Sequence, residues 1–193
     1  MMKTSPLLLK TSPDWISAVL EDFDGFLLDH AAAEKKASGM AMSMLSHYPD
    51  RISIVTQMAD LAIEELTHYR EVLKWILSRG QTIGPDKKDQ YVLALRQHIR
   101  KGSDVYLLDR LLIAGVIEAR GAERFALIGK SLRPSQIKKF YESLARSEAR
   151  HYELFLNLAK EYFPGKVIQA RWQQILDIEA NIVNNLPIRA ALH

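Results

Sequence analysis

The chain has 193 residues, of which 48% are hydrophobic and 25% are charged, and its formal net charge is +3 at pH 7. This length suits one domain with a core of its own, and the composition is ordinary for a globular protein. There is no cysteine, which excludes disulfides, thiolate zinc sites and cysteine-bound iron–sulfur clusters. Any metal must therefore be held by oxygen and nitrogen atoms.

Apolar residues recur at helical spacing through most of the chain, and no segment alternates in the manner of a β-strand. Capping residues, prolines and glycines divide this pattern into separate helical segments. The sequence therefore predicts an all-α fold. The expected helices cover residues 13–47, about 50–79, 87–101, about 104–131, about 135–162 and about 166–184. The short segment 87–101 is expected to be a crossover between two helical pairs. Residues 1–12 are expected to form an irregular arm, and Pro187 to leave a loose tail at 185–193.

No apolar run approaches the roughly 20 residues of a membrane span. The run Leu7–Leu9 is too short for the core of a signal peptide. We therefore expect a cytoplasmic protein. The small positive charge favours anionic partners only weakly.

Two Glu-x-x-His motifs carry the most specific chemical signal. Glu65 and His68 form one, and Glu148 and His151 form the other, inside the segment Ser-Glu-Ala-Arg-His. Side chains three residues apart share one face of a helix, so each pair can bind one metal ion.

A lone glutamate lies upstream of each motif. Glu34 precedes Glu65 by 31 residues, and Glu118 precedes Glu148 by 30, so the two halves of the chain superpose at an offset of 84 for the lone glutamates and 83 for the motifs. A glutamate from each of two helices, with Glu-x-x-His from each of two others, is the ligand set of a two-metal site in a four-helix bundle.

Each of these four glutamates interrupts an apolar stripe. Burying an unpaired carboxylate costs several kcal/mol, and divalent cations would remove that cost. The alternative is that the carboxylates are partly exposed and paired with Arg or Lys. A carboxylate-rich set with two imidazoles suits iron or manganese better than zinc. In such a centre Glu34 and Glu118 are terminal ligands, Glu65 and Glu148 bridge, and each histidine binds one metal.

The six-residue pattern resembles the ferritin-like di-iron superfamily. Ser-Glu-Ala-Arg-His is similar to the Asp-Glu-x-Arg-His motif of bacterial multicomponent monooxygenases, with serine in place of aspartate. The blocks 62–69 (Ala-Ile-Glu-Glu-Leu-Thr-His-Tyr) and 111–125 (Leu-Leu-Ile-Ala-Gly-Val-Ile-Glu-Ala-Arg-Gly-Ala-Glu-Arg-Phe) more closely resemble the tRNA hydroxylase family called MiaE. This resemblance covers essentially the whole chain.

The resemblance implies a ferritin-like four-helix bundle with a crossover helix and an extra C-terminal helix, as a single domain over 1–193. It also implies a non-haem di-iron monooxygenase that hydroxylates the isopentenyl side chain of 2-methylthio-isopentenyl-adenosine in the tRNA anticodon loop. Two iron ions would be its cofactors, dioxygen its co-substrate, and a reductase or ferredoxin its electron donor.

Residues near the expected metal centre suggest a pocket for the prenyl group. Small residues one turn from Glu118 leave room for dioxygen and substrate, and phenylalanines can line an apolar wall. The candidates are Ala114, Gly115, Gly121, Ala122, Phe23, Phe26 and Phe125. The alternatives are close helix packing for the small residues and an ordinary core for the aromatic ones.

Basic residues gather in the second half of the chain, where they are candidates for contacts with RNA phosphates. They are Arg120, Arg124, Lys130, Arg133, Lys138 and Lys139. The alternative is a set of solvated helix faces.

Two other functional classes stay open. One is a ferritin- or rubrerythrin-like bundle that handles metal or peroxide, and the other is a helical binding module without catalysis. A measurement of bound metal distinguishes the binding module, which needs none, from the two metal-dependent classes. Detection of a hydroxylated nucleoside in tRNA distinguishes the hydroxylase from a storage protein.

Overall fold

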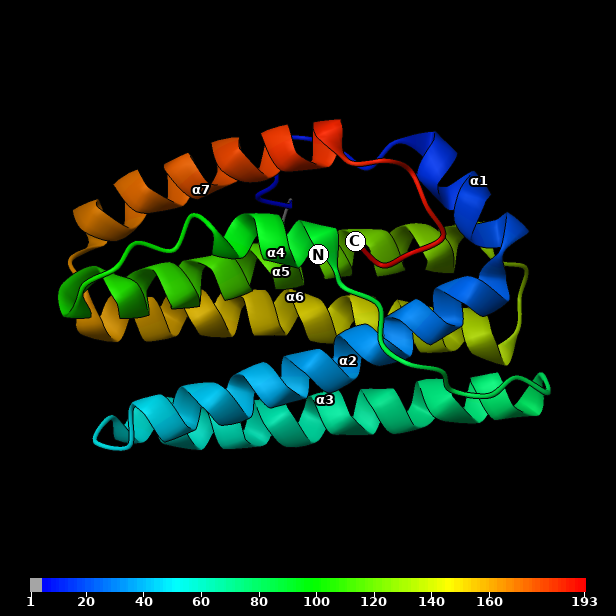
Figure 1. Cartoon of the computed structure of the whole chain (residues 1–193), viewed down its shortest axis with the longest axis horizontal. Helices are drawn as coiled ribbons and strands as arrows, with labels where there is room; N and C mark the ends of the chain where they lie inside the picture. The colour runs from blue at the N-terminus through cyan, green and yellow to red at the C-terminus, as the bar shows by residue number, and fades with distance from the viewer. Residues whose placement is uncertain (1–4) are drawn as a thin grey trace. The chain divides into compact units, whose positions relative to one another are not determined.

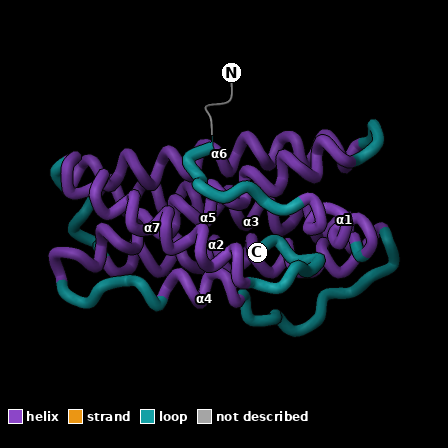
Figure 2. Tube along the Cα trace, turned by 90° about the horizontal axis from the view of Figure 1, so that it is seen from above, coloured by secondary structure: helices purple, strands orange, loops and turns teal. Residues whose placement is uncertain are grey.

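The computed structural model describes residues 5–193, and α-helix is the regular secondary structure found in that range (Figures 1 and 2). The helices are α1 Pro13–Glu21, α2 Phe23–His47, α3 Ile52–Ser78, α4 Gln90–Arg96, α5 Ser103–Ser131, α6 Gln136–Tyr162 and α7 Gly165–Asn185. The four long helices expected after residue 49 are confirmed, each beginning and ending within about two residues of its predicted bounds. Among the described residues, no helix combines the length and the apolar character that crossing a membrane requires.

The chain separates into two compact units. One unit comprises Ser17–Lys88 and Arg189–Leu192, and contains α2 and α3. The other comprises the chain up to Ile16, Asp89–Ile188 and His193, and contains α4 to α7.

In the first unit, α2 and α3 pack lengthwise as an antiparallel pair (Figure 1). Both helices carry buried apolar side chains that recur at helical spacing: Leu27, Ala41, Met44, Ile54, Met58, Leu61 and Val72. Ser38 adds a hydrogen bond between the helices, from its hydroxyl to the Ala62 carbonyl at 2.8 Å. The loop after α3 is tied to α2, because Lys35 Nζ lies 3.0 Å from Asp86 Oδ1 and Lys36 Nζ donates to the Lys87 carbonyl at 2.6 Å.

In the second unit, α5 and α6 form the equivalent pair, and α7 and α4 pack on it. Gly115 lies in a filled environment, since a Cβ there would be in ordinary van der Waals contact with Phe155 Cβ at 3.5 Å and with the Trp172 ring at 3.7 Å. At this position the structure supports close helix packing over open space for a substrate.

The single helix predicted over 13–47 is wrong, because the chain breaks at Asp22 between α1 and α2. The Asp22 carboxylate accepts a hydrogen bond from Gly25 N at 2.9 Å and so caps α2. A Cβ at Gly25 would clash with that carboxylate. The crossover helix is also shorter than predicted, since α4 begins after Asp89, which caps Val92 N at 2.9 Å.

The prediction of a loose C-terminal tail is also wrong. Pro187 does follow the end of α7, but Ala191 and Leu192 are buried. Leu192 N donates to Asp29 Oδ2 at 2.7 Å, and the His193 ring stacks on Tyr91 at 4.7 Å. In the predicted N-terminal arm, residues 1–4 lie outside the described residues, and 5–12 are non-helical.

Candidate metal centre

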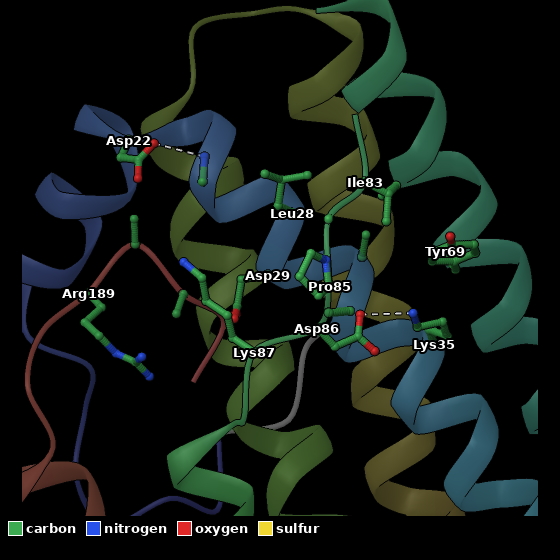
Figure 3. A pocket seen from close by; sticks show the side chains of 16 residues that line it. Asp22, Leu28, Asp29, Lys35, Tyr69, Ile83, Pro85, Asp86, Lys87 and Arg189 are labelled. Carbon is green, nitrogen blue, oxygen red and sulfur yellow. Dashed lines mark hydrogen bonds and ion pairs between the residues drawn. The ribbon is translucent and has the colours of Figure 1, made fainter. Parts of the chain in front are cut away.

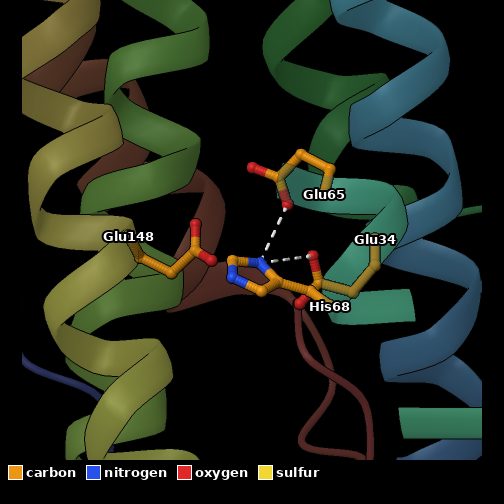
Figure 4. Close-up of side chains that lie close together, drawn as sticks. All are labelled: Glu34, Glu65, His68 and Glu148. Atoms are coloured by element: carbon orange, nitrogen blue, oxygen red, sulfur yellow. Dashed lines mark ion pairs between the residues drawn. The ribbon is translucent and has the colours of Figure 1, made fainter. Parts of the chain in front are cut away.

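Glu34, Glu65 and His68 come together in the unit that contains α2 and α3 (Figure 4). His68 Nδ1 lies 3.4 Å from Glu65 Oε2 and 3.7 Å from Glu34 Oε2. Glu65 and His68 are one turn apart on α3, and the antiparallel neighbour α2 supplies Glu34. Both glutamates are buried, and the histidine side chain is 13% exposed.

Glu118, Glu148 and His151 make a matching group in the other unit. His151 Nδ1 lies 3.3 Å from Glu148 Oε2 and 3.9 Å from Glu118 Oε2. The motif residues lie on α6, and Glu118 comes from α5. All three side chains are buried. We call the groups the α2–α3 triad and the α5–α6 triad.

The donor chemistry of each triad fits a divalent metal ion. Each offers two carboxylates and one imidazole, and within each triad the potential ligand atoms lie within 4.8 Å of one another. Two buried negative charges in so small a volume repel each other, and a divalent cation between them replaces that repulsion by attraction. Oxygen-rich ligation with one imidazole suits iron or manganese.

A buried histidine that the sequence analysis did not single out contacts one triad. His30 lies one turn before Glu34 on α2, and its Nε2 is 2.6 Å from Glu34 Oε1. Its side chain is fully buried and lies against the Phe26 ring at 5.8 Å. The i, i+4 spacing of a histidine and a glutamate on an apolar stripe was the signal that could have found it.

The serine that replaces aspartate in the Ser-Glu-Ala-Arg-His segment is also buried. Ser147 Oγ accepts a hydrogen bond from Arg150 Nη2 at 2.9 Å. The serine that departs from the motif and the arginine that matches it are thus bonded to each other.

Two of the predicted RNA contacts are corrected, because Arg120 and Arg124 are buried. Arg120 forms an ion pair with Glu179, with Nε 2.8 Å from Oε1, and also bonds to Glu123. The Arg124 guanidinium lies 4.9 Å from the centre of the Trp15 ring. Burial, reinforced by the Arg120 charge, lowers the pKa of Arg124 to about 10. Neither guanidinium is available to a phosphate on the surface.

The other predicted cations lie at the turn between α5 and α6. Lys130, Arg133 and Lys139 are exposed. Lys138 is half-buried, donates to the Gly129 carbonyl and lies 3.1 Å from Glu142 Oε1. The RNA-binding prediction is therefore reduced to three exposed cations.

The predicted substrate-lining residues lie in both units. In the α2–α3 unit Phe26 is buried, and Phe23 lies under the Arg79 guanidinium at 5.7 Å. In the other unit Phe125 is buried against Tyr141, with ring centres 5.7 Å apart.

The small residues of that predicted lining lie on α5. Ala122 is buried, and a Cβ on Gly121 would lie 3.9 Å from Glu148 Cγ, so the backbone here is close to a candidate ligand. Together with the three phenylalanines they stay a predicted lining.

A cavity of about 390 Å³ lies elsewhere in the α2–α3 unit, between α2, the loop after α3 and residues 189–191 (Figure 3). Its lining combines apolar side chains with charged ones, among them Asp29, Lys35, Asp86 and Arg189. None of the predicted substrate-lining residues borders it.

Comparison with known proteins gives consistent results. A family model described as tRNA-(MS[2]IO[6]A)-hydroxylase (MiaE) matches residues 2–193. The tRNA 2-(methylsulfanyl)-N(6)-isopentenyladenosine(37) hydroxylase of Pseudomonas putida is 38% identical over 152 residues, which are 78% of this chain and 74% of that protein. The Salmonella typhimurium protein of the same name is 29% identical over 180 residues, 90% of this chain and 66% of that protein.

A solved structure is similar over nearly the whole length. It is protein 43 with aldehyde deformylating oxygenase activity from Synechococcus, with a TM-score of 0.92 and 33% identity, covering 97% of this chain and 94% of that one. The all-α, ferritin-like fold class predicted from the sequence is confirmed.

Proposed function

The chain belongs to the MiaE family, and on that premise we propose that it is a non-haem di-iron monooxygenase that hydroxylates the isopentenyl side chain of 2-methylthio-isopentenyl-adenosine in tRNA. The observation that carries the proposal is the pair of matching triads. Each unit provides one glutamate and one Glu-x-x-His motif, with the ligand atoms grouped and the carboxylates buried.

We assign the six side chains to one dinuclear centre, with the roles that the ligand set of two-metal bundles suggests. Glu34 and Glu118 would serve as terminal ligands, and Glu65 and Glu148 would be the ligands shared by the two ions. His68 and His151 would each hold one ion through Nδ1, the nitrogen that faces the carboxylates of its triad.

Iron bound at this centre would supply, with dioxygen and two electrons, the oxidant that hydroxylation of a C–H bond requires and that amino-acid side chains cannot provide. The protein contributes position and environment. Each triad is held on two long helices, which fix its ligands better than loops would. Burial of the carboxylates keeps bulk water away and strengthens their interaction with a cation.

For the substrate, the proposal combines charge and an apolar lining. Lys130, Arg133 and Lys139 bind phosphates of the anticodon stem-loop, whose unpaired base can leave its stack. The predicted lining at Phe23, Phe26, Gly121, Ala122 and Phe125 receives the prenyl group. Electrons come from a redox partner protein of the reductase or ferredoxin type. Because the proposed substrate is tRNA, we propose a cytoplasmic location for the protein.

The test uses tRNA that carries the unhydroxylated nucleoside, incubated with iron-loaded protein, a reductant and dioxygen. Nucleosides released by digestion are analysed by mass spectrometry, and the modified adenosine is expected to gain the mass of one oxygen atom. Glu148→Ala should give no such product while its circular dichroism stays helical. Glu161→Ala, which removes an exposed glutamate from the same helix, should retain the product.

Unchanged tRNA with fully iron-loaded wild-type protein would contradict the proposal. If iron instead accumulated well beyond two ions per chain, the storage function of a ferritin-like bundle would be favoured.

A further inference from the structure

The two triads have equal ligand sets but unequal surroundings. In the α2–α3 triad, the fully buried His30 lies 2.6 Å from Glu34 Oε1 through its Nε2. The equivalent position in the α5–α6 triad follows from the offset of 84 that relates Glu34 to Glu118, and it is occupied by Ala114. No imidazole can reach Glu118 from that position.

The geometry points to His30 as a positioning residue that fixes Glu34 as a single-oxygen ligand and so makes the two metal sites unequal. This inference rests on the proposed iron centre and adds to it a residue that does not itself bind the metal.

The contact between His30 and Glu34 settles which carboxylate oxygen is available. A carboxylate only accepts hydrogen bonds, so His30 donates its Nε2–H to Oε1. The nitrogen–oxygen distance of 2.6 Å is short, and hydrogen bonds to a charged acceptor are shorter than those between neutral groups. The other oxygen, Oε2, is the one that faces His68 Nδ1, at 3.7 Å. Glu34 thus presents Oε2 toward the metal position while Oε1 is held by the histidine.

His30 is itself held in place. Its side chain has no exposed surface, and the Phe26 ring lies against it at 5.8 Å with the planes tilted by 32°. Phe26 and Glu34 lie one turn before and one turn after it on α2. An imidazole locked by packing can keep its partner carboxylate in one orientation, whereas a mobile one cannot.

The two lone glutamates therefore differ in how one of their oxygens is held. A rotation of Glu34 that brought Oε1 toward the metal position would strain its hydrogen bond to His30. Glu118 has Ala114 at the corresponding position, and a methyl group cannot donate a hydrogen bond to a carboxylate oxygen. We therefore expect the ion bound by the α2–α3 triad to depend on His30 and the other ion to be independent of it. Residues that orient a metal ligand typically contribute about 10- to 100-fold to metal affinity.

The test is a titration of metal-free protein with cobalt(II), followed by its visible absorption. Wild-type protein should bind two ions. His30→Phe keeps an aromatic ring but removes the hydrogen-bond donor. It should lower the affinity for one cobalt ion by about 10- to 100-fold and leave the affinity for the other unchanged. His30→Gln, whose amide N–H can reach across one helical turn, should restore most of the affinity. His47→Phe, at an exposed histidine on the same helix, is the control.

A double-mutant cycle with Glu34→Ala separates positioning from general packing. If His30 acts through Glu34, then His30→Phe should have no further effect on cobalt binding in the Glu34→Ala protein. Should His30→Phe fail to fold, as judged by circular dichroism of the metal-free protein, His30→Asn takes its place. Its shorter amide does not span the turn, so it should lose the affinity that His30→Gln keeps.

Each result has a distinct meaning. Two ions bound with unchanged affinity by the His30→Phe or His30→Asn protein would overturn the role of His30 and leave the iron centre standing. An equal loss of affinity for both ions would also overturn the role of His30, because His30 contacts a ligand of the α2–α3 triad. Fewer than two ions in the wild-type protein would overturn the dinuclear centre itself, and the role of His30 with it.

Discussion

Arg120 and Glu179 form an ion pair in which both side chains are fully buried, with Nε to Oε1 at 2.8 Å and Nη2 to Oε2 at 3.1 Å. Arg120 lies two residues after Glu118 on α5, and Glu179 lies on α7. Tyr91 of α4 donates to Glu179 Oε1 at 3.0 Å. The pair therefore connects the helix that carries a candidate ligand to both helices that pack on it.

Removing one partner of this pair should cost much of the stability of the fold. Glu179→Ala leaves a buried guanidinium without its main counter-charge, and we expect a loss of about 3–5 kcal/mol in the free energy of unfolding. Glu71→Ala, which breaks a surface pair with Lys74, should cost less than about 1 kcal/mol. Urea denaturation of both variants measures the difference, and equal losses would show that the buried pair is not a main stabilising contact.

Asp109 makes stability depend on acid pH. Its burial alone would raise its pKa, but hydrogen bonds from Arg100 and Arg171 outweigh that effect and lower the pKa below the ordinary 3.8. The unfolded chain therefore binds a proton at a higher pH than the folded one. The resulting stabilisation is present above about pH 4 and is lost as the pH falls through the folded-state value.

Asp109→Asn should thus lower the free energy of unfolding at neutral pH and reduce its decline below about pH 4. The measurement is the unfolding free energy by denaturant between pH 2.5 and pH 7, taken with buffers of about equal ionic strength. Asp177→Asn, at an exposed position of α7, should leave the profile of the wild-type protein unchanged. If the unfolding free energy of the Asp109→Asn protein declined below about pH 4 as steeply as that of the wild-type protein, Asp109 would not be the source of this pH dependence.

The exposed cations at the turn between α5 and α6 should govern the salt dependence of tRNA binding. Replacing Lys130, Arg133 and Lys139 together by alanine removes three possible phosphate contacts. The slope of log affinity against log salt should then fall by about 2. Replacing Arg70, Lys74 and Lys166, three exposed cations in other parts of the chain, removes the same charge and should change the slope far less. Equal changes would mean that only net charge matters.

Most of the fold could be predicted because helix ends carry local signals. Tyr48-Pro49 and Phe163-Pro164 end helices where a proline cannot continue them, and the apolar stripes between such breaks are regular. Asp22 gave no such signal, because the apolar stripe of residues 13–47 continues on either side of it and Asp22 lies off that stripe. Its capping of α2 depends on the absence of a side chain at Gly25.

The candidate ligands were predictable for a similar reason. Glu65 and His68 are three residues apart, and this spacing alone puts them on one helix face. Arg120 and Arg124 were misjudged, since arginine on a helix usually faces solvent and the partner Glu179 is 59 residues from Arg120. No local sequence pattern connects residues so far apart. The burial of Arg120 could therefore be recognised only from the three-dimensional structure, which shows its partner Glu179.

The number of ferrous ions that each chain binds in an anaerobic titration tests the central claim most directly. The six-ligand centre predicts that binding saturates at two ions per chain in the wild-type protein, and that Glu148→Ala falls short of two. Saturation at one ion or none, or an unchanged two ions after that substitution, would contradict it.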